Sequence, residues 1–367
     1  MRVVAFGTYR LWEQPRVQVL LEGLRAHGHE VVECNVPLSV DTESRVKMAA
    51  QPVRTPILAA KIAAAWPRLI AKARRLPRSE VVLVPYMGHF DVHLARRIFR
   101  KNPIVLDHFL FFRDTAVDRG AQSEPKLALL DRIDKSAVRA ADLVFVDSEG
   151  HREHLPEPIR SESLVVYIGT PPEWFHEPEP RGDGPLRVIF FGIYTPLQGA
   201  PVIGEAIRLL DPDPAEVRFT MAGRGQDLAR TKERAGDSPA VEWIDWVERD
   251  ELPALVFEHD ICLGIFSPGA KGMRVIPNKV FQGAAAGCAI VTSNSVSQQE
   301  ALGEAGRFVA PGDPQALADA LRWLLADRER VWELRRAAYR RAVEAFTPEA
   351  VVEPLHERLE AGVRKRR

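Results

Sequence analysis

The chain has 367 residues, 46% of them hydrophobic, which is enough for two cores of ordinary domain size. Lys and Arg together number 50, as do Asp and Glu, so the net charge is zero and argues against nucleic-acid binding as a bulk property. The three cysteines match no metal or redox spacing, no run of eighteen apolar residues occurs, and the amino terminus reads as a strand without a secretion signal. We expect a cytoplasmic protein, at most peripheral at the inner face of the membrane.

The first half alternates short β-branched runs with helical patterns. Strands are predicted at 3–6, 31–32, 81–84, 104–106 and 144–146, with a helix at 17–27 between the first two. Continuous apolar strands between helices indicate a parallel sheet covered on both faces. Residues 171–186 are rich in Pro, Gly and charge and mark a domain boundary.

A second α/β series follows this boundary. Strands are predicted at 187–191, 217–221, 261–263 and 289–292, helices at 200–210, 251–258 and 277–287, and a helical tail from 314 to 362. The fold class is therefore α/β, with two parallel-sheet domains. Ligands of such sheets bind beyond the carboxyl ends of the strands, so the functional residues should follow strands.

Two glycine-rich turns follow strands of the second half. The first contains Gly192, Thr195 and Gly199 and leads into a helix, so it is either an anion site or an ordinary strand–helix turn. The second contains Gly223 and Arg224, and a lone turn of this kind is usually only a tight turn.

The segment 271–287 is more specific. Its proline suits the first turn of a helix and its last glycine suits the end, while small residues at 283–286 let the helix approach its sheet. Three cations precede or open this helix, where the dipole disfavours them: Lys271, Arg274 and Lys279. An anionic ligand would explain them, and a solvated basic loop is the alternative.

The order of these pieces resembles a known family. From 188 to 318 the chain carries the glycine turn, the strand ending in GxG, VEWIDWVERDELPALVFEHDICL, PNKVFQGAAAG, AIVTSN and EAGRFVAPGDPQALADAL. This is similar to the donor-binding half of family 4 (group 1) glycosyltransferases, in a divergent branch with PLQG and KGMRVIPNK. The resemblance implies the GT-B fold: two Rossmann-like domains facing across a cleft, an acceptor domain at 1–172, a nucleotide-sugar donor domain at 173–345, and a helix at 346–362 that returns to the first domain.

The resemblance also implies an activity. We expect retaining, metal-independent transfer of a sugar from a nucleotide sugar, UDP- or GDP-linked, to a hydroxyl of a cell-envelope glycan, lipid-linked glycan or natural product, without a cofactor. A sugar phosphorylase or epimerase-type enzyme of the same fold and a non-catalytic nucleotide-sugar binding protein are the alternatives. A Rossmann dehydrogenase is excluded because no GxGxxG follows the first strand.

The chain departs from this family at four positions. Members commonly carry an Arg and a Lys in the first loop, where this chain has Ile193 and Gln198, and two glutamates eight residues apart, where it has Arg274 and Gln282. We expect the three cations named above to bind the diphosphate instead. The predicted donor-binding residues are Gly192, Thr195, Gly199, Gly223, Arg224, Lys271, Arg274, Asn278, Lys279 and Gln282.

The first domain should hold the acceptor. Several family members place a histidine near the sugar's reacting carbon; His108 is the nearest match, with Asp107 as the alternative, although strand-end Asp and His residues are also common as caps. His89 and His93 are spaced for a metal, but no third ligand follows in the sequence and we expect no metal. His151 and His154 also lack evident partners. The acceptor side is predicted to include Gly7, Tyr9, His89, Asp114 and Arg119.

Residues 54–78 contain seven cations and no acid. Apolar residues with a Trp lie on one helical face, and we expect Pro67 to split the segment into two helices. Such a surface suits peripheral contact with a membrane; a solvated helix packed on the domain is the alternative.

Overall fold

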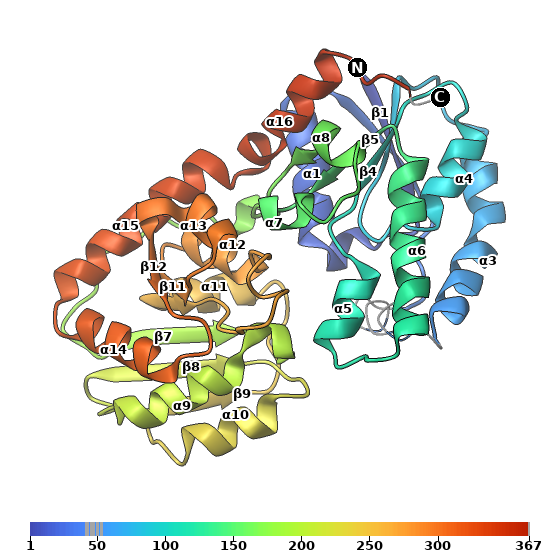
Figure 1. The fold of residues 1–367 in the computed structure, drawn as a ribbon. Helices are drawn as coiled ribbons and strands as arrows, with labels where there is room; N and C mark the ends of the chain where they lie inside the picture. The colour runs from blue at the N-terminus through green and yellow to red at the C-terminus, as the bar shows by residue number, and fades with distance from the viewer. Residues whose placement is uncertain (41–43, 45–47, 49–50, 52–53, 366–367) are drawn as a thin grey trace. The chain divides into compact units, whose positions relative to one another are not determined.

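The protein, analysed as a computed structural model, is described at residues 1–40, 44, 48, 51 and 54–365. Two compact units divide the chain (Figure 1). Unit 1 contains Met1–Ile168 and Pro348–Arg367, and unit 2 contains Gly169–Thr347. Each unit has its own parallel sheet between two layers of helices, and each is described here by itself.

The sheet of unit 1 has six parallel strands in the order β2-β1-β3-β4-β5-β6. The three strands at its centre, β3, β4 and β5, are buried along their whole length because helices cover both faces. The strands are β1 Arg2–Gly7, β2 Glu30–Asn35, β3 Val81–Val84, β4 Ile104–Asp107, β5 Leu143–Val146 and β6 Leu164–Val165.

Helices of unit 1 pack two separate apolar clusters against the sheet. On one face, α1 and the returning helix α16 contribute Leu20, Val352 and Leu355 to a single core (Figure 1). On the other face, α4 and α6 contribute Val92 and Val138. The helices are α1 Pro15–Ala26, α3 Thr55–Ala73, α4 Asp91–Ile98, α5 Phe112–Asp118, α6 Glu124–Ala140, α7 Glu149–Arg152, α8 Ile159–Glu162 and α16 Pro348–Glu360.

The sheet of unit 2 also has six parallel strands, in the order β12-β11-β10-β7-β8-β9. Its strands are β7 Leu186–Phe191, β8 Val217–Ala222, β9 Val241–Ile244, β10 Ile261–Leu263, β11 Ala289–Ser293 and β12 Gly306–Val309. Its helices are α9 Ala200–Leu210, α10 Leu228–Ala235, α11 Leu252–Phe257, α12 Asn278–Ala285, α13 Val296–Leu302, α14 Pro314–Leu325 and α15 Arg328–Ala345. Pro277, predicted inside the first turn of α12, is instead the residue that precedes it.

The sequence prediction missed the strands β6, β9 and β12. All three lie at sheet edges, and most of their residues are only half-buried. They therefore lack the continuous apolar run that marks a central strand.

The prediction that Pro67 splits the basic segment was wrong, because α3 is one helix that contains it. Proline removes one backbone donor, and the carbonyl that it leaves unpaired, at Ala63, lies on the exposed side of the helix where water can reach it. The buried face remains continuous through Ile62, Ala65 and Leu69. In the described part of the chain, no helix is both long and apolar enough to cross a membrane.

Candidate functional site

The strand orders place a topological switch point in each unit. In unit 1, β2 and β3 lie on opposite sides of β1, and in unit 2, β8 and β10 lie on opposite sides of β7. Loops that leave such a pair of strands diverge to opposite faces and open a crevice between them. The residues after β1 and β3 and those after β7 and β10 are therefore the first candidates for binding.

In unit 2 the loops at this edge are packed into one another. The amide of Phe266, after β10, donates to the carbonyl of Gln198 at 3.0 Å. A Cβ on Gly199, whose φ is +62°, would lie 2.4 Å from the amide nitrogen of Ser267, and one on Gly223 would lie 1.9 Å from the carbonyl oxygen of Gly192. Glycine is needed at both positions because the backbones approach so closely. The two glycine-rich turns and the segment after β10 thus form one surface.

Lys279, the second residue of α12, extends its side chain to this surface. Its side chain is 5% exposed, and its ammonium donates to the side-chain oxygen of Gln198 and lies 3.6 Å from the centroid of the Phe190 ring. A Cβ on Gly192 would lie 3.7 Å from the same nitrogen. None of the contacts that the structure describes for this ammonium is to a carboxylate, and burial lowers the pKa of Lys279 to about 7.

The other predicted donor residues lie around this point with less definition. Gln282 is buried in α12, while Asn278 is exposed at its first residue. Arg224 follows β8 and stacks on Trp246, with its guanidinium carbon 4.4 Å from the ring centroid. Thr195 precedes the short 3-10 helix Pro196–Gln198.

Lys271 and Arg274 lie in the turn between β10 and α12. The amide of Arg274 donates to the carbonyl of Lys271 at 3.1 Å, so both residues belong to one local turn. In the described residues the ammonium of Lys279 makes no hydrogen bond to this turn. Of the three cations predicted to act together, Lys279 therefore lies against the Gly192 loop, whereas Lys271 and Arg274 lie in the turn before α12.

In unit 1 the turn after β3 has an unusual backbone. Tyr86 and Met87 have φ values of +22° and +55°. Residues other than glycine rarely adopt such positive values, and where they do the position is often a functional site. Asp107 accepts the amide of Tyr86 at 3.4 Å and forms a buried ion pair with Arg16 at 2.8 Å. Both oxygens of this carboxylate are engaged, so Asp107 supports the turn, and the catalytic role offered to it as an alternative has no support from its contacts.

His108 follows β4 at the same edge and is 1% exposed. Among the described residues, neither nitrogen of its ring has a hydrogen-bond partner. The ring meets Phe111 edge to face at 4.5 Å between centroids. Burial, and then the positive charge available on His89 and His151, lowers the pKa of His108 well below the usual imidazole value. The neutral ring offers one donor and one acceptor to a ligand.

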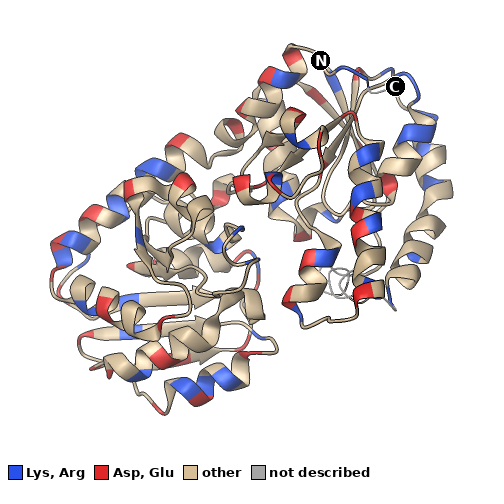
Figure 2. Cartoon of the chain, in the orientation of Figure 1, with Lys and Arg blue, Asp and Glu red and all other residues tan. Residues whose placement is uncertain are grey.

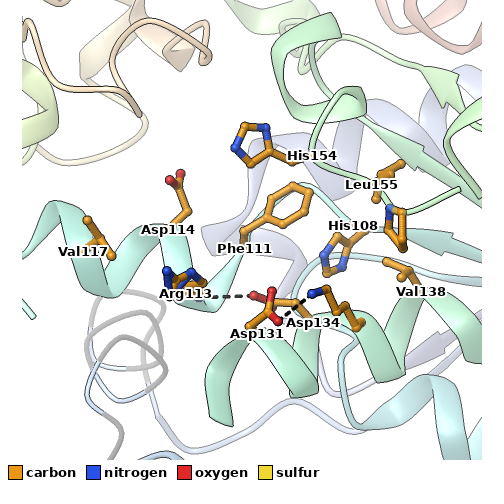
Figure 3. A pocket seen from close by; sticks show the side chains of 12 residues that line it. His108, Phe111, Arg113, Asp114, Val117, Asp131, Asp134, Val138, His154 and Leu155 are labelled. Carbon is orange, nitrogen blue, oxygen red and sulfur yellow. Dashed lines mark hydrogen bonds and ion pairs between the residues drawn. The ribbon is translucent and has the colours of Figure 1, made fainter. Parts of the chain in front are cut away.

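A pocket of about 190 Å³ lies beside His108 (Figure 3). Phe111 supplies an aromatic wall, while Lys135 is paired with Asp131 at 2.7 Å on α6. An apolar wall with a few convergent polar groups is the usual composition of a small-molecule site. The lining residues are His108, Phe111, Arg113, Asp114, Val117, Asp131, Asp134, Lys135, Val138, His154, Leu155 and Pro156.

His89 lies next to His108, stacked on Phe112 at 3.8 Å between ring centroids. Its Nε2 lies 3.0 Å from Asp134, a carboxylate of α6 that also accepts the amides of Phe112 and Arg113 at the start of α5. His89, His108 and Asp134 have ligand atoms within 4.8 Å of one another and could hold a metal. The hydrogen bonds engage Asp134 and the Nε2 of His89, whereas the Nδ1 of His89 and both nitrogens of His108 have no hydrogen-bond partner among the described residues.

Several sequence expectations for unit 1 need correction. The structure groups His89 with His108 and Asp134, and His93 is not part of this cluster in the described residues. His151 has a partner in Asp147. Tyr9 is fully buried and donates to Glu33 at 3.1 Å, so it belongs to the core instead of an acceptor surface.

The remaining predicted residues differ in position. Gly7 ends β1 and packs against Asp91, and Asp114 lines the pocket. Arg119 follows the end of α5 and is not among the residues that line the pocket. Sequence reasoning missed Asp134 and Phe111. Asp134 lies within an ordinary amphipathic helix 45 residues from His89, so no local pattern signals it.

Comparison with known proteins shows which class of protein this chain resembles. Residues 185–327 match the family described as glycosyl transferases group 1. A sequence comparison with curated proteins finds no match. The sucrose-phosphate synthase of Thermosynechococcus elongatus superposes with a TM-score of 0.69 at 16% identity, covering 98% of each chain.

Two further solved structures have the same architecture. Anabaena HepE, in complex with UDP and glucose, superposes with a TM-score of 0.68 at 15% identity, covering 98% of this chain and all of its own. A UDP-forming α,α-trehalose-phosphate synthase from Burkholderia vietnamiensis gives 0.66 at 14%, covering 98% and 99%. At these identities the likeness shows the fold alone.

The two six-stranded parallel units therefore have the GT-B fold, as the sequence predicted. The family match covers most of unit 2, so residues 185–327 are similar to glycosyl transferases group 1, in the part of the chain where the sequence carries the predicted resemblance.

Proposed function

We propose that the protein is a glycosyltransferase that moves a sugar from a nucleotide-diphosphate sugar, UDP-linked or GDP-linked, to an acceptor hydroxyl, with retention at the anomeric carbon and without a metal. The buried ammonium of Lys279 carries this proposal. It lies against the Gly192 loop at the switch point of unit 2, where its only hydrogen bond in the described chain is to the neutral Gln198.

A diphosphate supplies what this ammonium lacks. A buried cation without an anionic partner is unfavourable, and an anion beside it restores the charged form. Gly192 has no side chain to cover the loop, so a phosphate can approach both the loop backbone and the amine. Lys271 and Arg274, in the turn that leads into α12, add positive charge, so the leaving diphosphate is stabilised by side chains and needs no metal ion. The UDP complexes of Anabaena HepE favour uridine as the nucleoside.

The pocket at His108 is the proposed acceptor side. A neutral imidazole with a free donor and a free acceptor can bind a hydroxyl group that must give and receive a hydrogen bond. Phe111 offers an apolar face to a sugar ring or a similar small molecule. His108 would then touch the substrate near the reacting carbon and align the acceptor hydroxyl.

The test is isothermal titration of UDP, GDP and a panel of their sugars into the wild type and the Lys279→Met variant. We expect at least about a tenfold loss of affinity for the correct donor, because one charge-assisted contact is removed. The matched control is Lys232→Met in the last turn of α10, which removes an exposed ammonium 5.2 Å from the centroid of the Trp243 ring in β9. Equal affinities in wild type and Lys279→Met would contradict the donor site.

The reaction itself needs separate assays. Turnover of the donor found by titration, with the product's anomeric configuration read by NMR, tests retention, and turnover after chelation of divalent ions tests metal independence. Binding without transfer to any acceptor would favour a non-catalytic binding protein, the alternative motivated by Arg274 and Gln282 at the positions where the family commonly has glutamates. Product formation from a sugar phosphate would favour a phosphorylase, and conversion of the donor sugar an epimerase-type enzyme.

We further propose that the protein works in the cytoplasm and contacts the inner face of the membrane through α3. The exposed side of this helix and the residues after it carry Lys61, Arg68, Arg74 and Arg75, and Figure 2 shows blue without red along α3. Ile57, 52% exposed, adds an apolar side chain to the same helix. Such a face suits anionic lipid, and the buried free cysteines suit a reducing compartment.

Liposome flotation tests this contact. The wild type should float with vesicles that contain anionic lipid, and should release them at high salt. The Lys61→Gln/Arg68→Gln variant should float less, while Arg230→Gln/Lys232→Gln on α10 should behave as the wild type. Flotation that is independent of lipid charge would contradict the proposal.

A further inference from the structure

A second cluster of metal-ligating side chains lies in unit 1 at the edge of the sheet opposite to His108. His29 immediately precedes β2, so it lies at the amino ends of the strands, whereas His108 follows β4 at their carboxyl ends. His356 and Glu360 are one turn apart on α16, which packs on α1 beside this edge. The proposed transfer reaction uses none of these groups.

The geometry of the cluster is that of a chelating site. His29 Nε2 lies 3.0 Å from His356 Nδ1, and one ligand atom from each of His29, His356 and Glu360 lies within 4.8 Å of the other two. Two nitrogens bound to one zinc ion at about 2.0–2.1 Å in a tetrahedral arrangement are about 3.3–3.4 Å apart. The two rings therefore need to move by only a few tenths of an ångström, and the carboxylate by a rotamer adjustment.

The groups beside the cluster contact other parts of its two rings than the nitrogens that face each other. The Met1 nitrogen lies 3.4 Å from His29 Nδ1, and His27 stacks on His356 at 4.4 Å between ring centroids. His27 also has its Nε2 2.9 Å from the carbonyl oxygen of Glu349, so it is occupied elsewhere. His29 is 4% exposed while Glu360 is exposed, which leaves a path for an ion from solvent.

We propose that His29, His356 and Glu360 bind a divalent transition-metal ion of the zinc class, with water completing its coordination. Two imidazoles and one carboxylate are a ligand set that suits zinc. The ion would join His29 to a helix 327 residues away in the sequence and so fasten α16 to the rest of unit 1. Its role is structural, because the site lies at the far edge of the sheet from the pocket and is compatible with a transfer reaction that needs no metal.

The experiment uses the full chain after removal of metals by a chelator. Zn²⁺ is titrated calorimetrically, and hydrogen–deuterium exchange of peptides from α16 and from 27–30 is measured with and without Zn²⁺. We expect slower exchange in both segments on binding, because the ion stabilises the folded state. Glu360→Gln and His356→Gln should each weaken binding by at least about tenfold and remove the protection.

Two controls separate this site from other histidines. His93→Gln removes an imidazole of unit 1 whose Nε2 lies near Ser136, and should leave affinity and protection unchanged. His108→Ala removes the other cluster of potential ligands, so any isotherm that survives it belongs to a different site. Glu360 is exposed and glutamine matches it in size, so this variant should fold. Unchanged zinc affinity in both α16 variants, or zinc binding without protection of α16, would overturn the proposal.

Discussion

The proton on Lys279 gives the sharpest test of the proposed donor site. Burial lowers the pKa of this ammonium to about 7, whereas a lysine next to a diphosphate should titrate near its ordinary value of about 10.4. Only the protonated form is the proposed partner of the diphosphate. The protonated fraction of the free protein falls from about 0.9 at pH 6 to about 0.03 at pH 8.5, so the apparent Kd should rise about thirtyfold over this range.

The assay is isothermal titration of the nucleotide sugar itself. Its diphosphate is esterified at both ends and has no ionisation near neutral pH, so the pH dependence belongs to the protein. Heats measured in buffers of different ionisation enthalpy report proton uptake, which should be about half a proton at pH 7 and close to one at pH 8.5. Protons are taken up, and not released, because binding of the donor raises the pKa of the Lys279 amine.

Two variants isolate the amine. Lys279→Arg keeps its charge throughout this range and should bind the donor with little pH dependence, and Lys279→Met should bind weakly at every pH. If the wild type takes up no proton on binding, and its Kd is the same at pH 7 and pH 8.5, then the buried ammonium is not the partner of the diphosphate.

The other predictions concern stability and the acceptor side. Without donor, Lys279→Met should raise the free energy of unfolding at pH 7 by on the order of 1–4 kcal/mol, measured by denaturant titration. The reason is that burial lowers the pKa of Lys279 in the folded protein, so the unfolded chain binds the proton more tightly. The lysine therefore destabilises the fold at any pH below its unfolded pKa. His108→Ala should lower kcat by on the order of 100-fold with little change in donor Kd, whereas His154→Ala, at the same pocket, should leave kcat within a few fold. Gly199→Ala and Gly28→Ala both place a Cβ at a positive φ, +62° and +80°, but only the first brings its Cβ within 2.4 Å of backbone, because a Cβ on Gly28 meets nothing within 4 Å. Thermal unfolding should show a loss of about 1 kcal/mol for Gly28→Ala and at least about 3 kcal/mol for Gly199→Ala, and equal losses would mean that the loops do not interlock.

The parallel sheets could be predicted because their central strands are buried on both faces. A run such as 81–84 is apolar at every position, and that pattern survives without any knowledge of its neighbours. Edge strands have one open side, and the half-buried residues of β12 show how little of the pattern then remains. Pro67 misled the helix prediction for a related reason, since the cost of a proline depends on whether water can reach the carbonyl that it leaves unpaired.

The proposed acceptor pocket shows a different limit of sequence reasoning. His108 could be chosen because it follows a strand at the edge where ligands bind. Asp134 could not, because its role is to hold His89 and the first amides of α5, and these contacts join three elements that are separated along the chain. The residues that orient a site leave no spacing pattern, and only the fold assembles them.

Lys279 and Gln198 illustrate both a local sequence pattern and a contact that only the fold assembles. At position 198 the resembling family commonly has a lysine, and by sequence alone this chain has lost that charge. In the fold, Lys279 extends from α12 to the oxygen of Gln198, so an ammonium lies on the same loop although it comes from another element 81 residues away. A phosphate interacts with the position of a charge and not with its place in the sequence. With glutamine at position 198, the ammonium at this loop therefore comes from Lys279. The proton-uptake experiment above tests whether this ammonium binds the diphosphate.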